Sequence, residues 1–176
     1  MDSTDSNPLC LECGLCCNGV IFADGQLQPA DDAPRLEALG LRLLPHRPSP
    51  IAHQKFQQPC AAFDNCRCRI YGGHPQYCRE FECLTLKRMK TGRLETAAAE
   101  RVIRAARQRA DKVKRLLLEL GDDDERMALS LRFQRMQKRL ESRMTDDETA
   151  ELFSRLTLAV HGLNLLLSEA FYPGSR

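Results

Sequence analysis

The sequence predicts a mainly α-helical protein, in which a cysteine-rich and loop-rich module precedes an antiparallel bundle of about three helices. All nine cysteines lie between Cys10 and Cys83, where prolines and glycines divide the chain into loops and short elements. From Leu84 onward, apolar residues recur at the three-to-four-residue spacing of one helix face. We therefore expect the cysteine module over residues 1–90 and the helical bundle over residues 91–176.

Three long helices are expected in the second half. The first lies within residues 91–120, because the apolar residues between Ala99 and Leu120 fall on one face of a helix. Gly121 is expected to end this helix, since glycine readily adopts the left-handed conformation that terminates helices. Asp122 or Asp123 is then a candidate N-cap for the second helix, because a carboxylate accepts hydrogen bonds from first-turn amides.

The second expected helix has an apolar side that runs from Leu129 to Leu140. Thr145 and Glu148 match a capping box, which predicts that the third helix starts there. Because the connections between these helices are short, we expect neighbouring helices to pack antiparallel. A shorter helix is expected near residues 78–90, between the last cysteines and the bundle.

Composition and charge argue against several classes of protein. The 176 residues carry a formal net charge of +2, which disfavours a strongly polyanion-seeking protein. No apolar run approaches the roughly 18 residues that a membrane-spanning helix needs, so no membrane partner is expected. The residues before Cys10 are polar and acidic and do not match a secretory signal. We therefore expect a cytoplasmic protein in a reducing environment.

The cysteines fall into two clusters, and in a reducing compartment such clusters indicate metal binding or redox chemistry rather than a disulfide framework. The first cluster reads CLECGLCC and contains Cys10, Cys13, Cys16 and Cys17. The second contains Cys60, Cys66, Cys68, Cys78 and Cys83. Zinc and iron–sulfur clusters, including the 4Fe-4S type, both commonly take four such ligands. Cys17 directly follows Cys16, so we expect its side chain to serve a second ion or to bridge two close ones.

The run CLECGLCC, followed by CAAFDNCRCRIYGGHPQYCREFEC, resembles the CxxCxxCC family of zinc- or iron-chelating domains, also called YkgJ-like. The resemblance covers about residues 10–83. It implies that zinc or iron is held by the cysteines at the motif positions, which are Cys10, Cys13, Cys16, Cys17, Cys60, Cys68, Cys78 and Cys83. Such a set suffices for two four-ligand sites or one binuclear cluster, and we expect ligands from both segments to mix.

Two residues depart from the pattern of the family. Cys66 is an extra thiol, and His74 stands where the family usually has arginine, so either would alter a site if it ligated. Tyr71, Arg79 and Phe81 surround the second cluster. They are expected either to adjust the charge and the reduction potential of the metal centre without ligating it, or simply to pack against the motif. The sequence leaves open the identity of the metal and the assignment of each ligand.

Other functions are weaker alternatives. The family includes proteins similar to flagellin lysine N-methylase, which implies an iron–sulfur redox protein, or an accessory protein or enzyme of that kind, as the alternative. No glycine-rich cofactor loop follows a strand. A nucleophilic cysteine would need a histidine partner, but nothing singles out one cysteine among the nine. Basic residues between Arg101 and Arg115 form a stripe, but acidic residues interrupt it, so nucleic acid is not expected. The expected partner is a metal ion, and no protein partner is identified.

Overall fold

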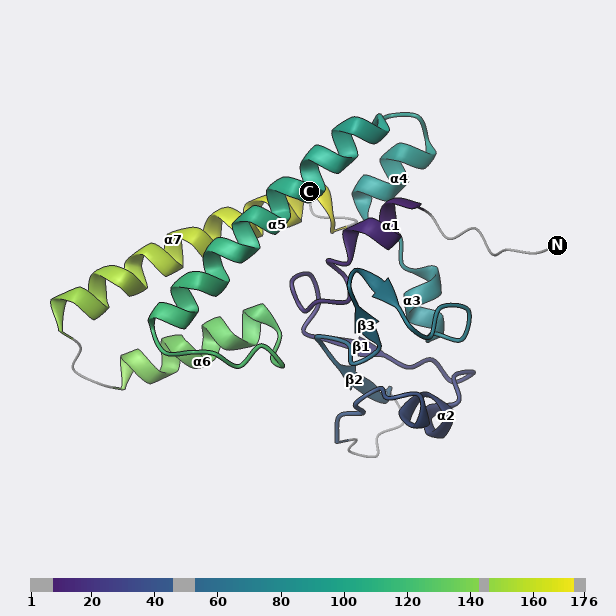
Figure 1. The fold of residues 1–176 in the computed structure, drawn as a ribbon, viewed down its shortest axis with the longest axis horizontal. Helices are drawn as coiled ribbons and strands as arrows, with labels where there is room; N and C mark the ends of the chain where they lie inside the picture. Colours follow the sequence, from purple (N-terminus) through teal and green to yellow (C-terminus); the bar gives the residue numbers. More distant parts are fainter. Residues whose placement is uncertain (1–7, 46–52, 143–145, 173–176) are drawn as a thin grey trace. The chain divides into compact units, whose positions relative to one another are not determined.

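The structure, a computed structural model, describes residues 8–45, 53–142 and 146–172, which divide into two compact units. The first unit extends to Phe81 and includes Arg126–Ala128, and the second comprises Glu82–Glu125 and the chain from Leu129 on. The described ranges contain seven helices and four short strands, so the prediction of a mainly α-helical protein is confirmed (Figure 1). None of the helices in these ranges combines the length and the apolar character that spanning a bilayer requires.

The first unit is built from short helices and two small antiparallel sheets. Its helices are α1 (Pro8–Cys13), α2 (Ala33–Ala38) and α3 (Gln76–Glu80). Its strands are β1 (Asp24–Gln26), β2 (Lys55–Gln57), β3 (Phe63–Asp64) and β4 (Arg67–Cys68). β1 pairs with β2 so that Gly25 lies opposite Phe56, and β3 pairs with β4. Two-stranded sheets are marginal by themselves, so these elements depend on a shared core.

A small apolar core joins the elements of the first unit. Phe56 of β2 is only 1% exposed and belongs to this core. The core consists of Leu27, Leu36, Leu41, Phe56 and Ala62. Two partly buried cysteines, Cys60 and Cys78, pack against it. The core therefore positions two of the predicted metal ligands directly.

The described part of the second unit contains four helices. They are α4 (Leu84–Lys90), α5 (Thr96–Glu119), α6 (Leu129–Glu141) and α7 (Asp147–Ala170). α5 and α7 lie side by side and run in opposite directions, and α6 contacts α5 (Figure 1). Ile103 and Val113 of α5 are buried, as the spacing of apolar residues predicts, and so is Leu163 of α7.

The short helix that is predicted near residues 78–90 is present as α4, and a second short helix, α3, precedes it. Phe81 and Cys83 have extended backbone conformations, which separate α3 from α4. The long helix lies within residues 91–120, as predicted. Gly92 follows α4 with a φ of +68°, and α5 begins only at Thr96.

The end of α5 lies at Gly121, as predicted. Gly121 has a φ of +81°, a left-handed conformation that glycine adopts without strain. Its amide donates to the carbonyl oxygen of Leu118 at 2.9 Å, and the amide of Asp122 donates to that of Leu117 at 2.8 Å. This pair of hydrogen bonds is a Schellman motif, which satisfies carbonyls that the helix end would otherwise leave without partners.

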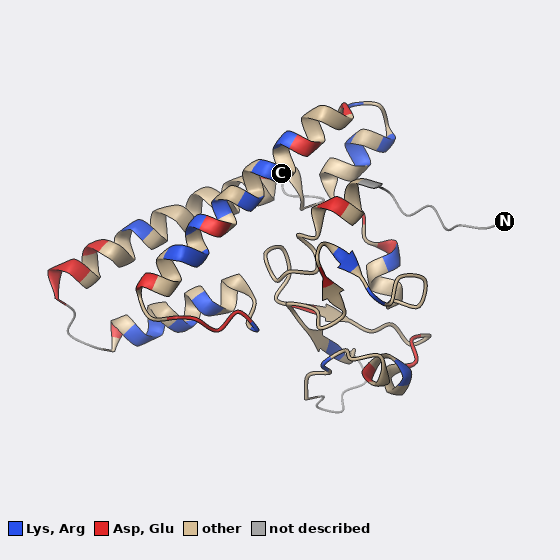
Figure 2. Ribbon diagram, in the orientation of Figure 1, with Lys and Arg blue, Asp and Glu red and all other residues tan. Residues whose placement is uncertain are grey.

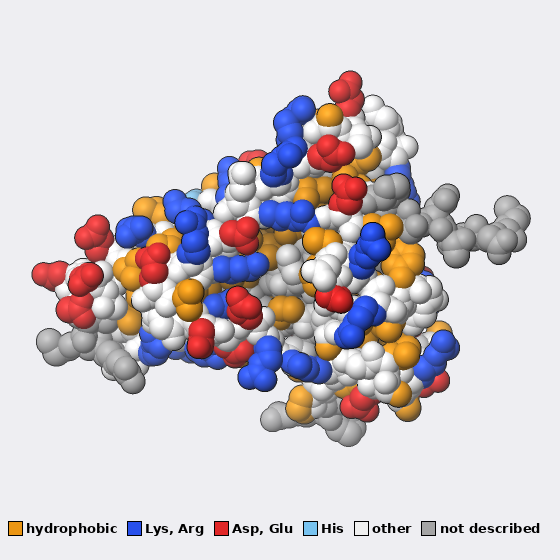
Figure 3. Space-filling view, viewed as in Figure 1, with side chains coloured by type: hydrophobic (Ala, Val, Ile, Leu, Met, Phe, Trp, Pro, Cys, Tyr) orange, Lys and Arg blue, Asp and Glu red, His pale blue; other side chains and the backbone are white. Residues whose placement is uncertain are grey.

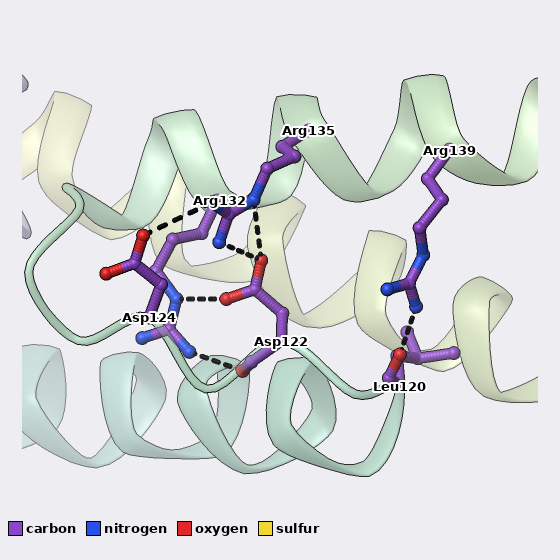
Figure 4. Close-up of polar contacts among 6 residues, drawn as sticks. All are labelled: Leu120, Asp122, Asp124, Arg132, Arg135 and Arg139. Atoms are coloured by element: carbon purple, nitrogen blue, oxygen red, sulfur yellow. Dashed lines mark hydrogen bonds and ion pairs between the residues drawn. The ribbon is translucent and has the colours of Figure 1, made fainter.

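The prediction that Asp122 or Asp123 caps the second long helix is wrong. α6 begins only at Leu129, and the Asp122 carboxylate binds arginines of α6 instead (Figure 4). Its Oδ1 accepts from Nε of Arg132 at 2.8 Å, and its Oδ2 accepts from Nη2 of Arg135 at 2.7 Å. The side chains of Asp122 and Arg132 are 3% and 4% exposed. A carboxylate buried this deeply requires charged partners, which explains why Asp122 serves an ion pair rather than a cap.

The N-cap of α7 is Asp146, one residue beyond the predicted Thr145, which lies outside the described residues. Oδ1 of Asp146 accepts a hydrogen bond from the amide of Thr149 at 2.8 Å. At the other end of α7, Oγ1 of Thr85 in α4 donates to the carbonyl oxygen of Ala170 at 2.6 Å. This bond satisfies one of the carbonyls that every helix end leaves free.

Charged residues of both signs are distributed over the second unit. Figure 2 shows mostly basic residues with some acidic ones along α5, and Figure 3 shows charges of both signs on the face in view. Nζ of Lys114 lies 3.5 Å from Oδ1 of Asp111, and Nη1 of Arg109 donates to the carbonyl oxygen of Gly162 at 2.6 Å. Part of the basic stripe is therefore engaged within the second unit itself.

Candidate metal centre

The first cysteine cluster lies on α1 and on the turn that follows it. Cys10 and Cys13 belong to α1, and Gly14 follows the helix with a φ of +66°. A Cβ atom at Gly14 would lie 2.5 Å from Cζ of Phe63, so a larger residue would displace that ring. The amide of Cys17 donates to the carbonyl oxygen of Gly14 at 3.0 Å. Gly14 therefore sets the path of the chain from α1 to Cys17.

A backbone hydrogen bond joins the first cysteine cluster to the second. The amide of Cys60 donates to the carbonyl oxygen of Cys17 at 2.8 Å. Residues of α1 also contact β4, the strand that contains Cys68. Cysteines that are far apart in the sequence therefore lie in one region of the first unit.

Cys66 lies at the tip of the hairpin formed by β3 and β4. Asp64 pairs with Arg67, which leaves Asn65 and Cys66 as a two-residue turn with φ values of 44° and 64°. A positive φ at both central residues is typical of a type I′ turn. The extra thiol thus has a structural position in the turn, and Cys68 follows it in β4.

Cys78 lies on α3, whose first turn is held by an aspartate from another loop. Oδ1 of Asp31 accepts from the amide of Gln76 at 2.9 Å, and its Oδ2 accepts from the amide of Gln28 at 2.8 Å. The amide of Cys78 donates to the carbonyl oxygen of Pro75 at 2.9 Å. The sequence pattern does not reveal this role of Asp31, because no local signal links that loop to α3.

Several of the predicted ligands interact electrostatically. The pKa of Cys17 is raised to about 12, first by burial and then by the neighbouring thiols of Cys60, Cys68, Cys13 and Cys10. The pKa of Cys78 is raised by burial and then by Cys17, Cys60, Cys68 and the carboxylate of Asp31. Burial also raises the pKa values of Cys60 and Cys68, because it disfavours the charged thiolate. We call Cys17, Cys60, Cys68 and Cys78 the thiol cluster.

The thiol cluster has the donor chemistry of a site for a soft metal ion. Neighbouring thiolates in a half-buried site repel one another, and a bound cation offsets that repulsion. Thiolate sulfur suits zinc and iron–sulfur chemistry alike. In the ranges that the structure describes, however, no three or more cysteine, histidine or acidic side chains are arranged so that they could hold an ion. The donor types therefore fit the metal, and the arrangement of the ligands stays a prediction.

An aromatic group lies beside Cys16 and Cys78. The ring of Phe22 packs edge-on against Tyr77 and Phe81, with centroid distances of 5.8 and 4.9 Å. The pKa of Tyr77 is raised by burial and then by the thiols of Cys16 and Cys78. The sequence analysis identifies only Phe81, because Phe22 is distant from the second cysteine cluster and Tyr77 carries no motif signal. We call Phe22, Tyr77 and Phe81 the aromatic group.

His74 and its neighbours shape the loop that precedes α3. The rings of Tyr71 and His74 stack with a centroid distance of 4.8 Å, and Nδ1 of His74 accepts from the amide of Gly72 at 3.1 Å. Nη1 of Arg79 donates to the carbonyl oxygen of His74 at 2.6 Å. Burial, and then the charge of Arg79, lowers the pKa of His74, which favours the neutral imidazole. These contacts give Tyr71, His74 and Arg79 a role in the conformation of the loop.

Cys83 belongs to the second unit, whereas the other seven predicted ligands belong to the first. It is the N-cap of α4, where its Sγ accepts a hydrogen bond from the amide of Leu86 at 3.4 Å. Burial raises the pKa of this thiol, and the amides of Leu86 and Thr85 oppose that effect. The capping role is not foreseen from the sequence, because Ser, Thr, Asp and Asn are the usual caps.

The comparison with protein families points to the same region of the chain. The model of the CxxCxxCC family, described as "Putative zinc- or iron-chelating domain", matches residues 9–108. The matched range includes all eight predicted ligands and continues into α5, beyond the residues 10–83 that the cysteine motifs cover. No curated protein and no solved structure matches the chain.

Proposed function

Because the chain belongs to the CxxCxxCC family, we propose that it binds zinc or iron through clustered cysteine thiolates. The observation that carries the proposal is the thiol cluster. A backbone hydrogen bond links Cys17 to Cys60, and the thiols of Cys68 and Cys78 interact with the same pair. Four thiolates are the number that a closed zinc site or an iron–sulfur cluster commonly takes.

The remaining predicted ligands of the first unit, Cys10, Cys13 and Cys16, are assigned to a second ion close to the first. Cys10 and Cys13 both act electrostatically on Cys17, which supports a place for Cys17 between the two ions. The second set then includes Cys10, Cys13 and Cys16, with Cys17 shared between the two ions. In this assignment the two centres together use cysteines that are distant in sequence, so metal binding ties the segments of the first unit together.

Metal binding in this protein has a structural consequence. The described part of the first unit consists of loops and short elements, and small loop-rich modules commonly gain folding free energy from a bound metal. We assign metal binding to a module over residues 1–90. A bundle of about three antiparallel helices over residues 91–176 would support that module. The reducing cytoplasm is the compartment in which such thiols persist as metal ligands.

The aromatic group favours a second candidate function, in which the centre is an iron–sulfur cluster, for example of the 4Fe-4S type. Phe22, Tyr77 and Phe81 form a packed apolar set, and Tyr77 interacts with Cys16 and Cys78. Aromatic side chains near a cluster exclude water and shift its reduction potential. The protein would then be a redox protein, or an accessory protein or enzyme related to flagellin lysine N-methylase.

Anaerobic purification of the full-length protein, followed by metal analysis and a visible spectrum, separates these functions. A structural zinc protein is colourless and contains about one or two zinc ions per chain. An iron–sulfur protein is brown, contains iron and acid-labile sulfide, and loses visible absorption when it is reduced. A reduced full-length protein that carries neither metal, and that stays folded in the presence of a chelator, would overturn the proposal.

A further inference from the structure

α7 carries a stripe of residues separated by alternating steps of three and four, in which four side chains are exposed and the central residue is half-buried. These residues are Arg155, Leu158, Gly162, Leu165 and Glu169, and we call them the α7 stripe. This spacing places all of them on one face of the helix, as in the seam of a coiled coil. Leu158 is 72% exposed and Leu165 is 50% exposed. Covering these two large apolar side chains would remove apolar surface from contact with water, which favours binding at this helix face.

Gly162 lies in the middle of this stripe, and the contacts of its own chain do not explain it. Glycine destabilises the interior of a helix relative to alanine, and α7 is 24 residues long. Apart from its two chain neighbours and the nearby backbone of its own helix, a Cβ atom at Gly162 would meet no atom of the described structure within 4 Å. Arg109 binds only the carbonyl oxygen, which every residue has. Close approach of another backbone is a physical reason for a glycine at an open position.

The charges of the α7 stripe are placed symmetrically about Gly162. Arg155 precedes it by seven residues and Glu169 follows it by seven, so each lies about 10 Å away along the helix axis. Among the described residues, neither side chain has an ion-pair partner. α7 has no Lys, Arg, Asp or Glu between them, and its ribbon is uncharged there (Figure 2). The stripe is therefore complementary to an antiparallel copy of itself.

We propose that the α7 stripe is the interface of a homodimer, in which two α7 helices cross antiparallel on a two-fold axis through Gly162. In this arrangement Arg155 lies against Glu169 of the partner subunit, and symmetry repeats the pair on the other side. The leucines flank the crossing and cover one another. Gly162 allows the helices to approach closely at the axis. An interface of this kind is isologous, because the same patch serves both subunits.

The proposal is tested by sedimentation velocity of the full-length protein over a range of concentrations. The wild type is expected to form a dimer with a micromolar dissociation constant, since a single helix pair is a small interface. In a homodimer of Arg155→Glu or of Glu169→Arg, both intersubunit ion pairs become pairs of like charges. The dissociation constant of each variant dimer is therefore expected to rise by at least about tenfold. An equimolar mixture of the two variants restores both opposite-charge pairs, so the mixture is expected to form a heterodimer.

Control variants separate this interface from other effects. Lys138→Glu reverses an exposed charge on α6 and is expected to leave the dimer unchanged. Gly162→Ala is expected to raise the melting temperature of the monomer and to weaken the dimer, two effects that a purely structural role would not combine. A wild type that stays monomeric at all concentrations would overturn the proposal. So would a dimer that the mixed variants fail to restore, or a monomer that Leu158→Glu destabilises because another part of the same chain covers the stripe.

Discussion

The backbone amide of Cys60 donates a hydrogen bond of 2.8 Å to the carbonyl oxygen of Cys17. This bond joins the two cysteine clusters through their main chain, and it therefore does not depend on the state of the thiols. Burial raises the pKa of both thiols, so both are protonated near neutral pH in the absence of a cation. The fold thus places the donors in one region, and a metal ion must displace their protons.

Serine substitutions in the thiol cluster are expected to remove metal. Cys17→Ser and Cys78→Ser each replace a thiolate by a hydroxyl, which is a poor ligand for a soft ion. Each variant loses one ligand of a four-ligand site, so we expect it to contain at least about one metal ion fewer per chain than the wild type. Elemental analysis after gel filtration measures this content. Cys66→Ser is the matched control, because Cys66 lies in the hairpin turn and outside the predicted ligand set. Equal metal content in Cys66→Ser and Cys17→Ser would contradict the assignment.

Gly14→Ala is expected to destabilise the protein and to weaken metal binding. The substitution places a Cβ 2.5 Å from Cζ of Phe63 at a φ of +66°, where only glycine is unstrained. We expect a loss of about 1 kcal/mol or more in the free energy of unfolding, measured by urea titration. Gly73→Ala serves as the control, because its Cβ would meet no atom closer than 3.7 Å. Similar losses in both variants would show that the turn after α1 has no special role.

Cys83→Ser separates the capping role of Cys83 from its predicted role as a ligand. Serine is a favourable N-cap, so the variant should keep the helix content of α4, measured by circular dichroism. If Cys83 ligates a metal as predicted, the same variant has a lower metal content than the wild type. Cys83→Ala is expected to lose both the cap and the metal. An unchanged metal content in Cys83→Ser would leave Cys83 as a cap alone and remove it from the ligand set.

Asp122→Ala is expected to be strongly destabilising. It removes the partner of Arg132, whose side chain is 4% exposed, and leaves a buried charge without compensation. Loss of one member of a buried ion pair costs about 3–5 kcal/mol, which is readily measured by chemical denaturation. Asp123→Ala removes an exposed carboxylate next in sequence and should change stability by no more than about 0.5 kcal/mol. A small effect of Asp122→Ala on the free energy of unfolding would mean that the ion pair between Asp122 and Arg132 does not stabilise the packing of α6.

Acid should destabilise the wild type through the same aspartate. Burial alone would raise the pKa of Asp122, but hydrogen bonds from Arg135 and Arg132 outweigh it and hold the pKa below its usual value. The contribution of Asp122 is therefore complete above the unfolded-state pKa of about 4, and it is lost as the pH falls toward the lower folded-state value. Urea titrations at several pH values should show this loss in the wild type. Asp122→Asn, which cannot ionise, should show a smaller dependence on pH.

The helical half of the fold is predicted well from the sequence because its signals are local. The periodic apolar face of α5 and the glycine at position 121 identify the helix and its end. The fate of Asp122 is not predicted, because a carboxylate after a helix looks like a cap whether or not distant arginines compete for it. Burial and the two arginines decide its role, and both are properties of the folded chain.

In the cysteine-rich half, the sequence predicts which residues are related but not how they contact one another. The motifs identify Cys10, Cys13, Cys17 and Cys78 as related residues without specifying how the chain joins them. The hydrogen bonds of Asp31, the packing of Phe22 against Tyr77 and the cap at Cys83 involve no sequence signal. They arise from tertiary contacts in a region with little regular structure, where a residue's neighbours in space cannot be inferred from its neighbours in sequence.

The metal content of the full-length protein, measured beside a fourfold variant, tests the central claim most directly. The variant replaces Cys17, Cys60, Cys68 and Cys78 by serine, and both proteins are purified anaerobically under identical conditions. The account predicts zinc or iron in the wild type and loss of at least one four-ligand centre in the variant. Equal metal content in the two proteins, with both folded, would contradict the claim that the thiol cluster is the metal site.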